Sequence, residues 1–175
     1  AGICARPYAK SVYDNCTNSG AISVSAKSAS AACYLGGIAA QVSNATSAGN
    51  GYDVENCSVT GDIYINCEAT WYVGGAIAYG SQWSSTTSNH RIASNNTVDA
   101  DIEIASKTIA HYVGGIIGHS GVHTDISDNS YTGTITVGSN DSSKLSNVGG
   151  IVGALIISQT SATSTMNAEF SISGN

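Results

Sequence analysis

Proline, charge and long apolar runs are all scarce in this sequence. One proline occurs among 175 residues, and only 10% of the residues are charged. The net charge is −6, so no basic surface is available to hold a nucleic acid backbone or an anionic membrane. The longest apolar stretch, residues 149–157, is too short to span a bilayer. These scarcities argue against nucleic acid partners and against membrane insertion.

Residues that favour turns and short strands dominate instead. Gly, Ser, Thr, Asn and Ala are abundant, which suits short strands joined by tight turns better than long helices. A chain of this length suits one domain. The composition therefore predicts a single all-β domain over residues 1–175.

The chain begins at Ala1, and no basic then apolar leader follows. This favours a processed mature form or a piece of a larger protein. Five cysteines in a small, charge-poor chain favour an oxidising compartment, and none has the paired spacing of a zinc site. Their odd number leaves one thiol free or bonded to another chain.

Paired glycines recur at regular intervals. They begin at Gly36, Gly74, Gly114 and Gly149, in steps of 38, 40 and 35 residues, within "YLGGIAA", "YVGGAIAYG", "YVGGIIG" and "NVGGIVG". Paired glycines would weaken an ordinary strand. A fixed period of this length is the mark of a stacked repeat.

A second motif lies between the glycine pairs. A polar pair is followed, six residues after its second member, by Ile and then by alternating polar and apolar residues. The equivalent positions are Cys16, Cys57, Asn96 and Asn129, and then Ile22, Ile63, Ile102 and Ile135. Alternation is the period of a half-buried strand, and the polar pair supplies a turn. A unit of this size cannot bury its apolar face alone. We therefore expect a parallel β-helix, or β-solenoid, of about four stacked repeats of 35–40 residues.

These motifs resemble the GLUG repeat. "NCSVTGDI" with "YVGGAIAYG", and "NSYTGTITV" with "NVGGIVG", look like that glycine-framed apolar unit over almost the whole chain. The third copy departs from the pattern, because Asp99 and Ala100 stand where Thr-Gly is usual. The repeat occurs in large microbial surface proteins and in non-catalytic regions of bacterial IgA-specific metallopeptidases. The resemblance implies an extracellular or cell-surface β-solenoid without catalytic residues or cofactors.

Two apolar columns follow the glycines and predict a further layer. Ile38, Ala76, Ile116 and Ile151 form one column, and Ala39, Ile77, Ile117 and Val152 form the next. We infer that both faces of this strand are apolar, so another layer must cover the outer face. That layer is a loop, a sheet of the same chain or another molecule, and the glycines let it approach closely.

A tyrosine column precedes the glycines, at Tyr34, Tyr72 and Tyr112, with Asn147 in the last copy. One interpretation is an aromatic ladder packed in support of the stack. The other is an exposed platform that binds a sugar or a partner protein. The sequence leaves both open.

Two further columns have a structural and a functional interpretation. Cys16 and Cys57 are one repeat apart, so they form either a disulfide or two stacked buried thiols. N-glycosylation sequons occur at Asn15, Asn44, Asn56, Asn95 and Asn140. Because Asn15, Asn56 and Asn95 share one column, they form either a glycan ladder or a row of inward or turn-capping side chains.

No enzyme or metal signature emerges. His90, His111, His119 and His123 include one pair four residues apart in "HSGVH", but the surrounding residues predict a loop. Asp99, Asp101 and Glu103 share one strand face, which fits an acidic solvated face better than a calcium site. No nucleophile motif appears. We expect no cofactor, no bound metal and no catalytic activity.

The two ends of the chain supply the functional hypothesis. "AGICA" at the start aligns with "GGIAA" at 36–40, and "AEFSISGN" at the end matches the alternating Ile strand. Half-repeats at both ends would complete one another between molecules, through the terminal residues Gly2, Ile3, Cys4, Phe170 and Ile172.

The leading hypothesis is therefore a non-enzymatic extracellular structural protein. Its repeats would stack end to end as a head-to-tail homopolymer, forming filaments or a surface appendage. The alternative is an adhesin-type binding module, excised from a larger surface protein, that holds a glycan or a host protein through the tyrosine column or the loops.

Overall fold

The fold is known from a computed structural model of the chain. It describes nine segments: residues 1–6, 11–28, 32–42, 52–80, 91–105, 111–121, 124–138, 147–155 and 170–175. Strands are the only regular elements in these segments, which confirms the all-β prediction.

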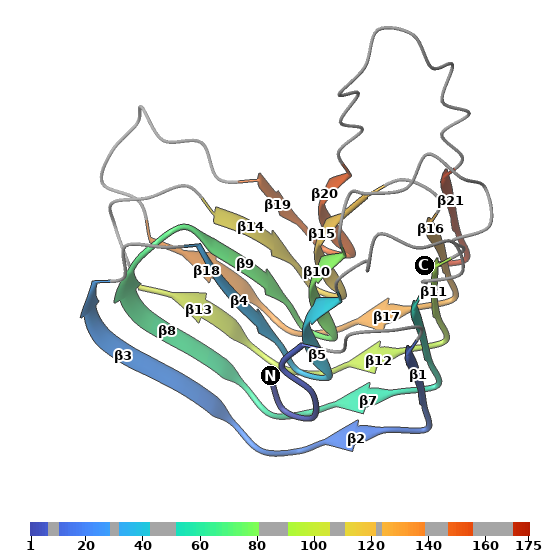
Figure 1. Cartoon of the computed structure of the whole chain (residues 1–175), viewed down its shortest axis with the longest axis horizontal. Coiled ribbons are helices and arrows are strands. Elements are labelled where there is room, and N and C mark those ends of the chain that lie inside the picture. The colour runs from blue at the N-terminus through green and yellow to red at the C-terminus, as the bar shows by residue number, and fades with distance from the viewer. Residues whose placement is uncertain are drawn as a thin grey trace, which may run out of the picture.

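The strands repeat in groups of five along the chain, and each group makes one coil of a solenoid (Figure 1). Coil 1 contains β1–β5, coil 2 β6–β10, coil 3 β11–β15 and coil 4 β16–β20, and β21 begins a fifth coil. Each of the strands β1 to β16 pairs in parallel with the strand five places further on, which gives five sheets. The prediction of about four stacked repeats in a parallel β-helix is confirmed.

The sheets are numbered here in the order in which each coil passes through them. Sheet 1 comprises β1 (Ser11–Asp14), β6 (Tyr52–Glu55), β11 (Arg91–Ser94), β16 (Thr124–Ser127) and β21 (Phe170–Ser173). Sheet 2 comprises β2 (Thr17–Asn18), β7 (Ser58–Val59), β12 (Thr97–Val98) and β17 (Ser130–Tyr131). Sheet 3 comprises β3 (Ile22–Ser28), β8 (Ile63–Glu68), β13 (Ile102–Ile104) and β18 (Ile135–Val137). Sheet 4 comprises β4 (Cys33–Gly36), β9 (Trp71–Gly74), β14 (His111–Gly114) and β19 (Asn147–Gly149). Sheet 5 comprises β5 (Ala39–Val42), β10 (Ile77–Gly80), β15 (Ile117–Ser120) and β20 (Val152–Leu155).

The register places equivalent residues of successive repeats side by side. The Ile column is formed by Ile22, Ile63, Ile102 and Ile135. The tyrosine column is formed by Tyr34, Tyr72, Tyr112 and Asn147. At the first end, Cys4 bridges Ala39, so residues 2–5 lie beside β5 as the "AGICA" alignment predicted.

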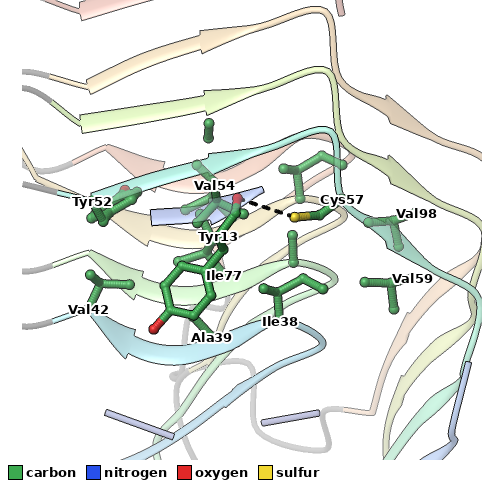
Figure 2. Close-up of a cluster of buried hydrophobic side chains, with 14 of the residues drawn as sticks. Tyr13, Ile38, Ala39, Val42, Tyr52, Val54, Cys57, Val59, Ile77 and Val98 are labelled. Carbon is green, nitrogen blue, oxygen red and sulfur yellow. Dashed lines mark hydrogen bonds between the residues drawn. The ribbon is translucent and has the colours of Figure 1, made fainter. Parts of the chain in front are cut away.

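Two apolar cores run along the stack. The first lies between sheets 1 and 5 and contains Tyr52, Val54 and Ile77 (Figure 2). The second lies between sheets 3 and 4 and contains Ile65 and Val73. Sheet 2 joins the two, with Val59 and Val98 facing the first core.

The glycine pairs form the corner between sheets 4 and 5. A Cβ on Gly75 would overlap the carbonyl oxygen of Gly115 in the next coil, so only glycine allows this backbone approach. Because the chain bends here, the residues after the pair, Ala76 and Ile77, enter the same core. The prediction that this strand has an apolar outer face was therefore wrong for these two columns. Its outer face does meet another layer, namely sheet 4 of the same chain.

A left-handed residue turns each coil from sheet 1 into sheet 2. Asn15, Asn56, Asn95 and Asp128 have φ values of 53° to 55°. Asn and Asp tolerate this conformation better than other non-glycine residues. The polar pair in each repeat therefore supplies the turn, as predicted.

The placement of the last strand differs from the sequence alignment. β21 pairs with β16 in sheet 1, with Ile172 beside Ile126, and not with the Ile strands of sheet 3. Alternation alone fits both sheets, but "FSISGN" also matches "TDISDN" at 124–129, including the turn. Gly174 takes the left-handed position with φ of 66°. The two terminal strands thus lie in different sheets, so they do not pair with each other in a continuous stack.

Candidate functional site

Apolar core residues become exposed at both ends of the stack. Val148 is 49% exposed, whereas Val113, its neighbour in coil 3, is fully buried. Ile172 is 51% exposed at the same end, and Ile3 is 45% exposed at the other. An end coil has a neighbour on one side only, so its inward side chains are half covered.

The sheets also end in open edges. Among the described residues, no strand pairs with the outer edges of β17, β18, β19 and β20, nor with those of β2, β3 and β4. β5 differs, because Cys4 donates its N–H to the carbonyl of Ile38 at 2.9 Å and accepts from Ala40 at 3.1 Å. Unpaired edges offer hydrogen bonds to a further strand.

The predicted assembly residues lie at opposite ends of the stack. Gly2, Ile3 and Cys4 lie beside coil 1, and Gly2 donates its N–H to Gly36 at 3.2 Å. Phe170 and Ile172 lie beside coil 4. The structure therefore brings together the members of each set but not the two sets.

The core column of sheet 2 has valine in the two middle coils and other residue types in the two end coils. Its middle members are Val59 and Val98, and its end members are Asn18 and Tyr131. The Asn18 amide donates to the carbonyl of Gly37 at 3.1 Å, in the glycine corner of the same coil. The Tyr131 ring packs against both cores, and burial raises the pKa of its phenol to about 12. These two side chains partly cover the ends of the cores.

A buried asparagine ladder holds the corner between sheets 1 and 2. The Oδ1 of Asn96 accepts the N–H of Cys57 at 3.0 Å, and that of Asn129 accepts the N–H of Asn96 at 3.0 Å. Asn175 continues the pattern by accepting the N–H of Asn129 at 2.9 Å. Each Asn side chain thus accepts a hydrogen bond from the backbone of the preceding coil. Only the recurrence of the polar pair pointed to this ladder.

The adjacent sequon column faces outward. Asn15, Asn56 and Asn95 are exposed, and the Asn95 amide donates to Oδ1 of Asn56 at 2.6 Å. Asn56 donates in turn to Asp14 at 2.8 Å. Of the interpretations that the sequence left open, an inward row does not apply to these three side chains, and a role in the turn does. Asn44 and Asn140 lie outside the described residues.

Cys16 and Cys57 are neighbours in their column and are free thiols, which is the second of the two interpretations that the sequence left open. Each thiol instead donates to a backbone carbonyl: Cys57 to Glu55 at 3.1 Å and Cys16 to Asp14 at 3.7 Å. Burial raises the pKa of Cys57 to about 11, which keeps it protonated.

The tyrosine column forms one half of a double aromatic ladder. Tyr72 stacks on Tyr34 at 5.1 Å and on Tyr112 at 4.7 Å between ring centroids. Tyr79 and His119 of sheet 5 stack on each other and meet the edges of these rings. The three column tyrosines stay partly exposed. The sequence did not predict the role of Tyr79 and His119. They share one column, but its member in coil 1 is Gln41, so no aromatic pattern recurs in every repeat.

The other ionisable groups do not converge. His111 lies in sheet 4 and His119 in sheet 5, and His90 and His123 fall outside the described residues. Burial lowers the pKa of His119 to about 4, so the ring is neutral at pH 7. No group of three potential metal ligands occurs in the part of the chain that the structure describes.

Two carboxylates of the acidic segment accept hydrogen bonds from the next coil. Asp99 accepts the Thr132 hydroxyl at 2.8 Å, and Asp101 accepts the N–H of Thr134 at 2.7 Å. Both side chains help to line a shallow pocket of about 160 Å³. Glu103 lies in β13, beside Thr136. The carboxylates of Asp99 and Asp101 therefore join coils 3 and 4.

Comparisons with known proteins find no match among family models, curated proteins or solved structures. No helix that could cross a membrane occurs in the described segments.

Proposed function

We propose that this chain is a non-enzymatic structural protein that extends by stacking end to end. One observation carries the proposal: both ends of the solenoid combine open parallel strand edges with half-exposed core residues, Val148 and Ile172 at one end and Ile3 at the other. Such a surface is completed by further coils of the same pattern.

The constancy of the register supports this proposal. Among the described strands, successive coils pair residue for residue in all five sheets, with a single irregularity between Ser25 and Ser28. A second copy would therefore meet the same strand spacing and the same core columns. The contact is head-to-tail and does not close, so it propagates into a rod.

An extracellular or cell-surface location is part of the proposal and rests on the resemblance to the GLUG repeat. The free thiols of Cys16 and Cys57 add nothing to the argument for an oxidising compartment. Glycosylation of the exposed Asn15, Asn56 and Asn95 stays a prediction. Adjacent rungs lie about 4.8 Å apart, which is too close for a glycan on each.

A second candidate function is the binding module. The observation that favours it is the row of stacked, partly exposed rings of Tyr34, Tyr72 and Tyr112. Stacked aromatic faces bind sugars and other flat ligands. The edge contacts from Tyr79 and His119 favour the packing role.

The test is sedimentation velocity with electron microscopy of the purified chain at rising concentration. We expect species that lengthen with concentration while their width stays constant. A monodisperse particle at every concentration would contradict the proposal. The triple substitution of Tyr34, Tyr72 and Tyr112 by Ser separates the two candidates, because a loss of glycan capture by the folded variant supports the binding module.

A further inference from the structure

All five cysteines lie within the first 67 residues of the chain, and coils 3 and 4 contain none. Cys16 and Cys57 occupy equivalent positions of coils 1 and 2. Cys33 of β4 and Cys67 of β8 also belong to coils 1 and 2, but they occupy different positions of the repeat, so the sequence pattern does not relate them. Cysteines are therefore concentrated where coil 1 meets coil 2.

Cys67 lies on the inner face of sheet 3, just before the chain turns into sheet 4. Ile63, Ile65 and Cys67 alternate with exposed residues along β8, and Cys67 is almost fully buried in the second core. The Trp71 indole donates its N–H to the carbonyl of Cys67 at 2.9 Å, which closes the turn between the two sheets. The Cys67 side chain is thereby held on the inner side of this corner.

Cys33 reaches the same corner from coil 1. It lies directly beside Trp71 in sheet 4, and its backbone N–H donates to the carbonyl of Thr70 at 2.8 Å. The Cys33 backbone is therefore one strand spacing, about 4.8 Å, from the turn that Cys67 begins. Cys33 is partly exposed and packs against the second core. The two cysteines thus contribute to one core from adjacent coils.

The register of sheet 3 changes opposite Cys67. Ser25 pairs with Asn66 and Ser28 with Glu68, so coil 1 has one more residue than coil 2 between these two pairs. Bulges of this kind bend a strand locally and alter the direction of its side chains. Among the described pairings, Cys67 consequently has no in-register partner in β3.

The electrostatics of the corner agree with this placement. Burial raises the pKa of the Cys33 thiol, and the Cys67 thiol raises it further. Two ionisable groups influence each other in this way only when they lie close together.

We propose that Cys33 and Cys67 are a disulfide site that fastens coil 1 to coil 2 at the corner between sheets 3 and 4. The inference concerns contacts within one copy and does not depend on end-to-end stacking. A small disulfide such as oxidised glutathione is the oxidant. The thiolate of the partly exposed Cys33 attacks it, forms a mixed disulfide and releases one glutathione thiolate. The Cys67 thiolate then displaces the second glutathione. One protein S–S bond forms, the glutathione S–S bond breaks, and the two thiol protons pass to the two glutathione products.

The pair formed by Cys16 and Cys57 should react more slowly. Cys57 donates its S–H to Glu55 at 3.1 Å, and Cys16 donates to Asp14 at 3.7 Å. These hydrogen bonds stabilise the protonated thiols, and burial raises the pKa of Cys57 to about 11. Because the thiolate is the reacting species, exchange at this pair is disfavoured.

The test treats the native chain with oxidised glutathione at about pH 8.5, where thiolates are more abundant, and at low protein concentration. The remaining thiols are counted after denaturation. We expect two of the five thiols to be lost. Cleavage at Lys27, Glu55 and Asp62 places Cys33, Cys57 and Cys67 on separate peptides, and the Cys33 and Cys67 peptides should be linked. Five remaining thiols, or a link between the Cys16 and Cys57 peptides alone, would overturn the proposal.

The variants Cys33→Ala and Cys16→Ala are matched controls, because each removes one partly exposed thiol from coil 1. Cys33→Ala should keep its four thiols under the oxidant, and Cys16→Ala should fall from four to two. Loss of two thiols from Cys33→Ala would contradict the assignment.

Stability gives a second readout. The disulfide closes the 33–67 loop in the unfolded chain, so oxidation should raise the urea midpoint of the native chain and of Cys16→Ala. It should not raise the midpoint of Cys33→Ala. Hydrogen exchange of β4 should slow on oxidation, and that of β14 in coil 3 should change less. An unchanged midpoint in the oxidised native chain would show that the disulfide does not fasten the two coils. Rod formation by the reduced chain is a separate measurement, so failure of this inference leaves the proposed function standing.

Discussion

Coil 3 and coil 4 carry the same sequence pattern but differ in burial. The core residues Ile102 and Ile104 of coil 3 are almost fully buried, and Val113 is completely so. Their counterparts Ile135 and Val137 in coil 4 are only partly buried, and Val148 is 49% exposed. The difference shows that a core side chain is fully buried only when its coil has another coil on each side. The repeat sequence alone does not provide it.

The largest expected effect comes from the glycine corner. In Gly75→Ala, the new Cβ would overlap the Gly115 carbonyl and the Val98 side chain, so we expect a loss of about 3 kcal/mol or more of unfolding free energy. The control is Gly150→Ala in coil 4, where a Cβ meets nothing within 4 Å. Urea unfolding measures both, and equal losses would contradict the comparison.

The asparagine ladder should give the next largest effect. Asn96→Ala removes the acceptor of the Cys57 N–H and the donor to the Val54 carbonyl, both buried, which should cost about 2–3 kcal/mol. Asn175→Ala acts on the exposed end of the same ladder and should cost about 1 kcal/mol. Thermal unfolding of the two variants is the measurement. A cost at Asn175 as large as that at Asn96 would show that the ladder is not weaker at its end.

A third pair of variants compares Val113 in coil 3 with Val148 in coil 4, which occupy the same core column. Val113→Ala creates a cavity in a fully buried site and should cost about 2–3 kcal/mol. Val148→Ala removes a half-exposed side chain and should cost less than about 1 kcal/mol. A cost of Val148→Ala as large as that of Val113→Ala at low protein concentration would contradict the comparison.

The smallest effect is a pH dependence from His119, which is 1% exposed and stacks on Tyr79 beside Tyr72 and Tyr112. Desolvation lowers its pKa from 6.5 to about 4 in the folded chain, and hydrogen bonds to its own backbone and to the Gly80 backbone oppose this shift. The unfolded chain therefore binds more protons between these pH values, and stability falls as pH falls from about 6.5 to about 4.

The expected loss is on the order of 2 kcal/mol. His119→Gln should remove this part of the pH dependence, as measured by unfolding at a series of pH values. An unchanged slope in the variant would show that other groups cause it.

The sequence predicted the columns because spacing and alternation are strong signals. The Tyr column follows from its equal offset to the glycine pairs, and the Ile column from its equal offset to the polar pairs. The register pairs both columns as expected. Two errors came from signals that are not unique. Alternation around Ile172 fits sheets 1 and 3 equally, and adjacent apolar residues such as Ala76 and Ile77 suggest two faces unless a corner is known.

The site was less predictable than the fold. Half-repeats at the ends were foreseen, but only three-dimensional pairing shows which sheets receive them. The inward ladder of Asn96 and Asn129 was not predicted, because the sequon drew attention to the neighbouring Asn95. Asn95 and Asn96 are both polar residues of the same turn, and the sequence does not show which of them points inward. Ring contacts between Tyr72 and His119 depend on the angle between sheets 4 and 5, which the sequence does not encode locally.

Hydrogen exchange of the native chain, resolved by residue and measured at low and high concentration, tests the central claim most directly. At low concentration, we expect strong protection in β8, β9, β13 and β14 and weaker protection in β18 to β21. High concentration should raise protection in β18 to β21, because end-to-end stacking gives these strands a second neighbour. Equal protection of all coils at both concentrations would contradict the dependence of each coil on its neighbours and the end-to-end stacking built on it.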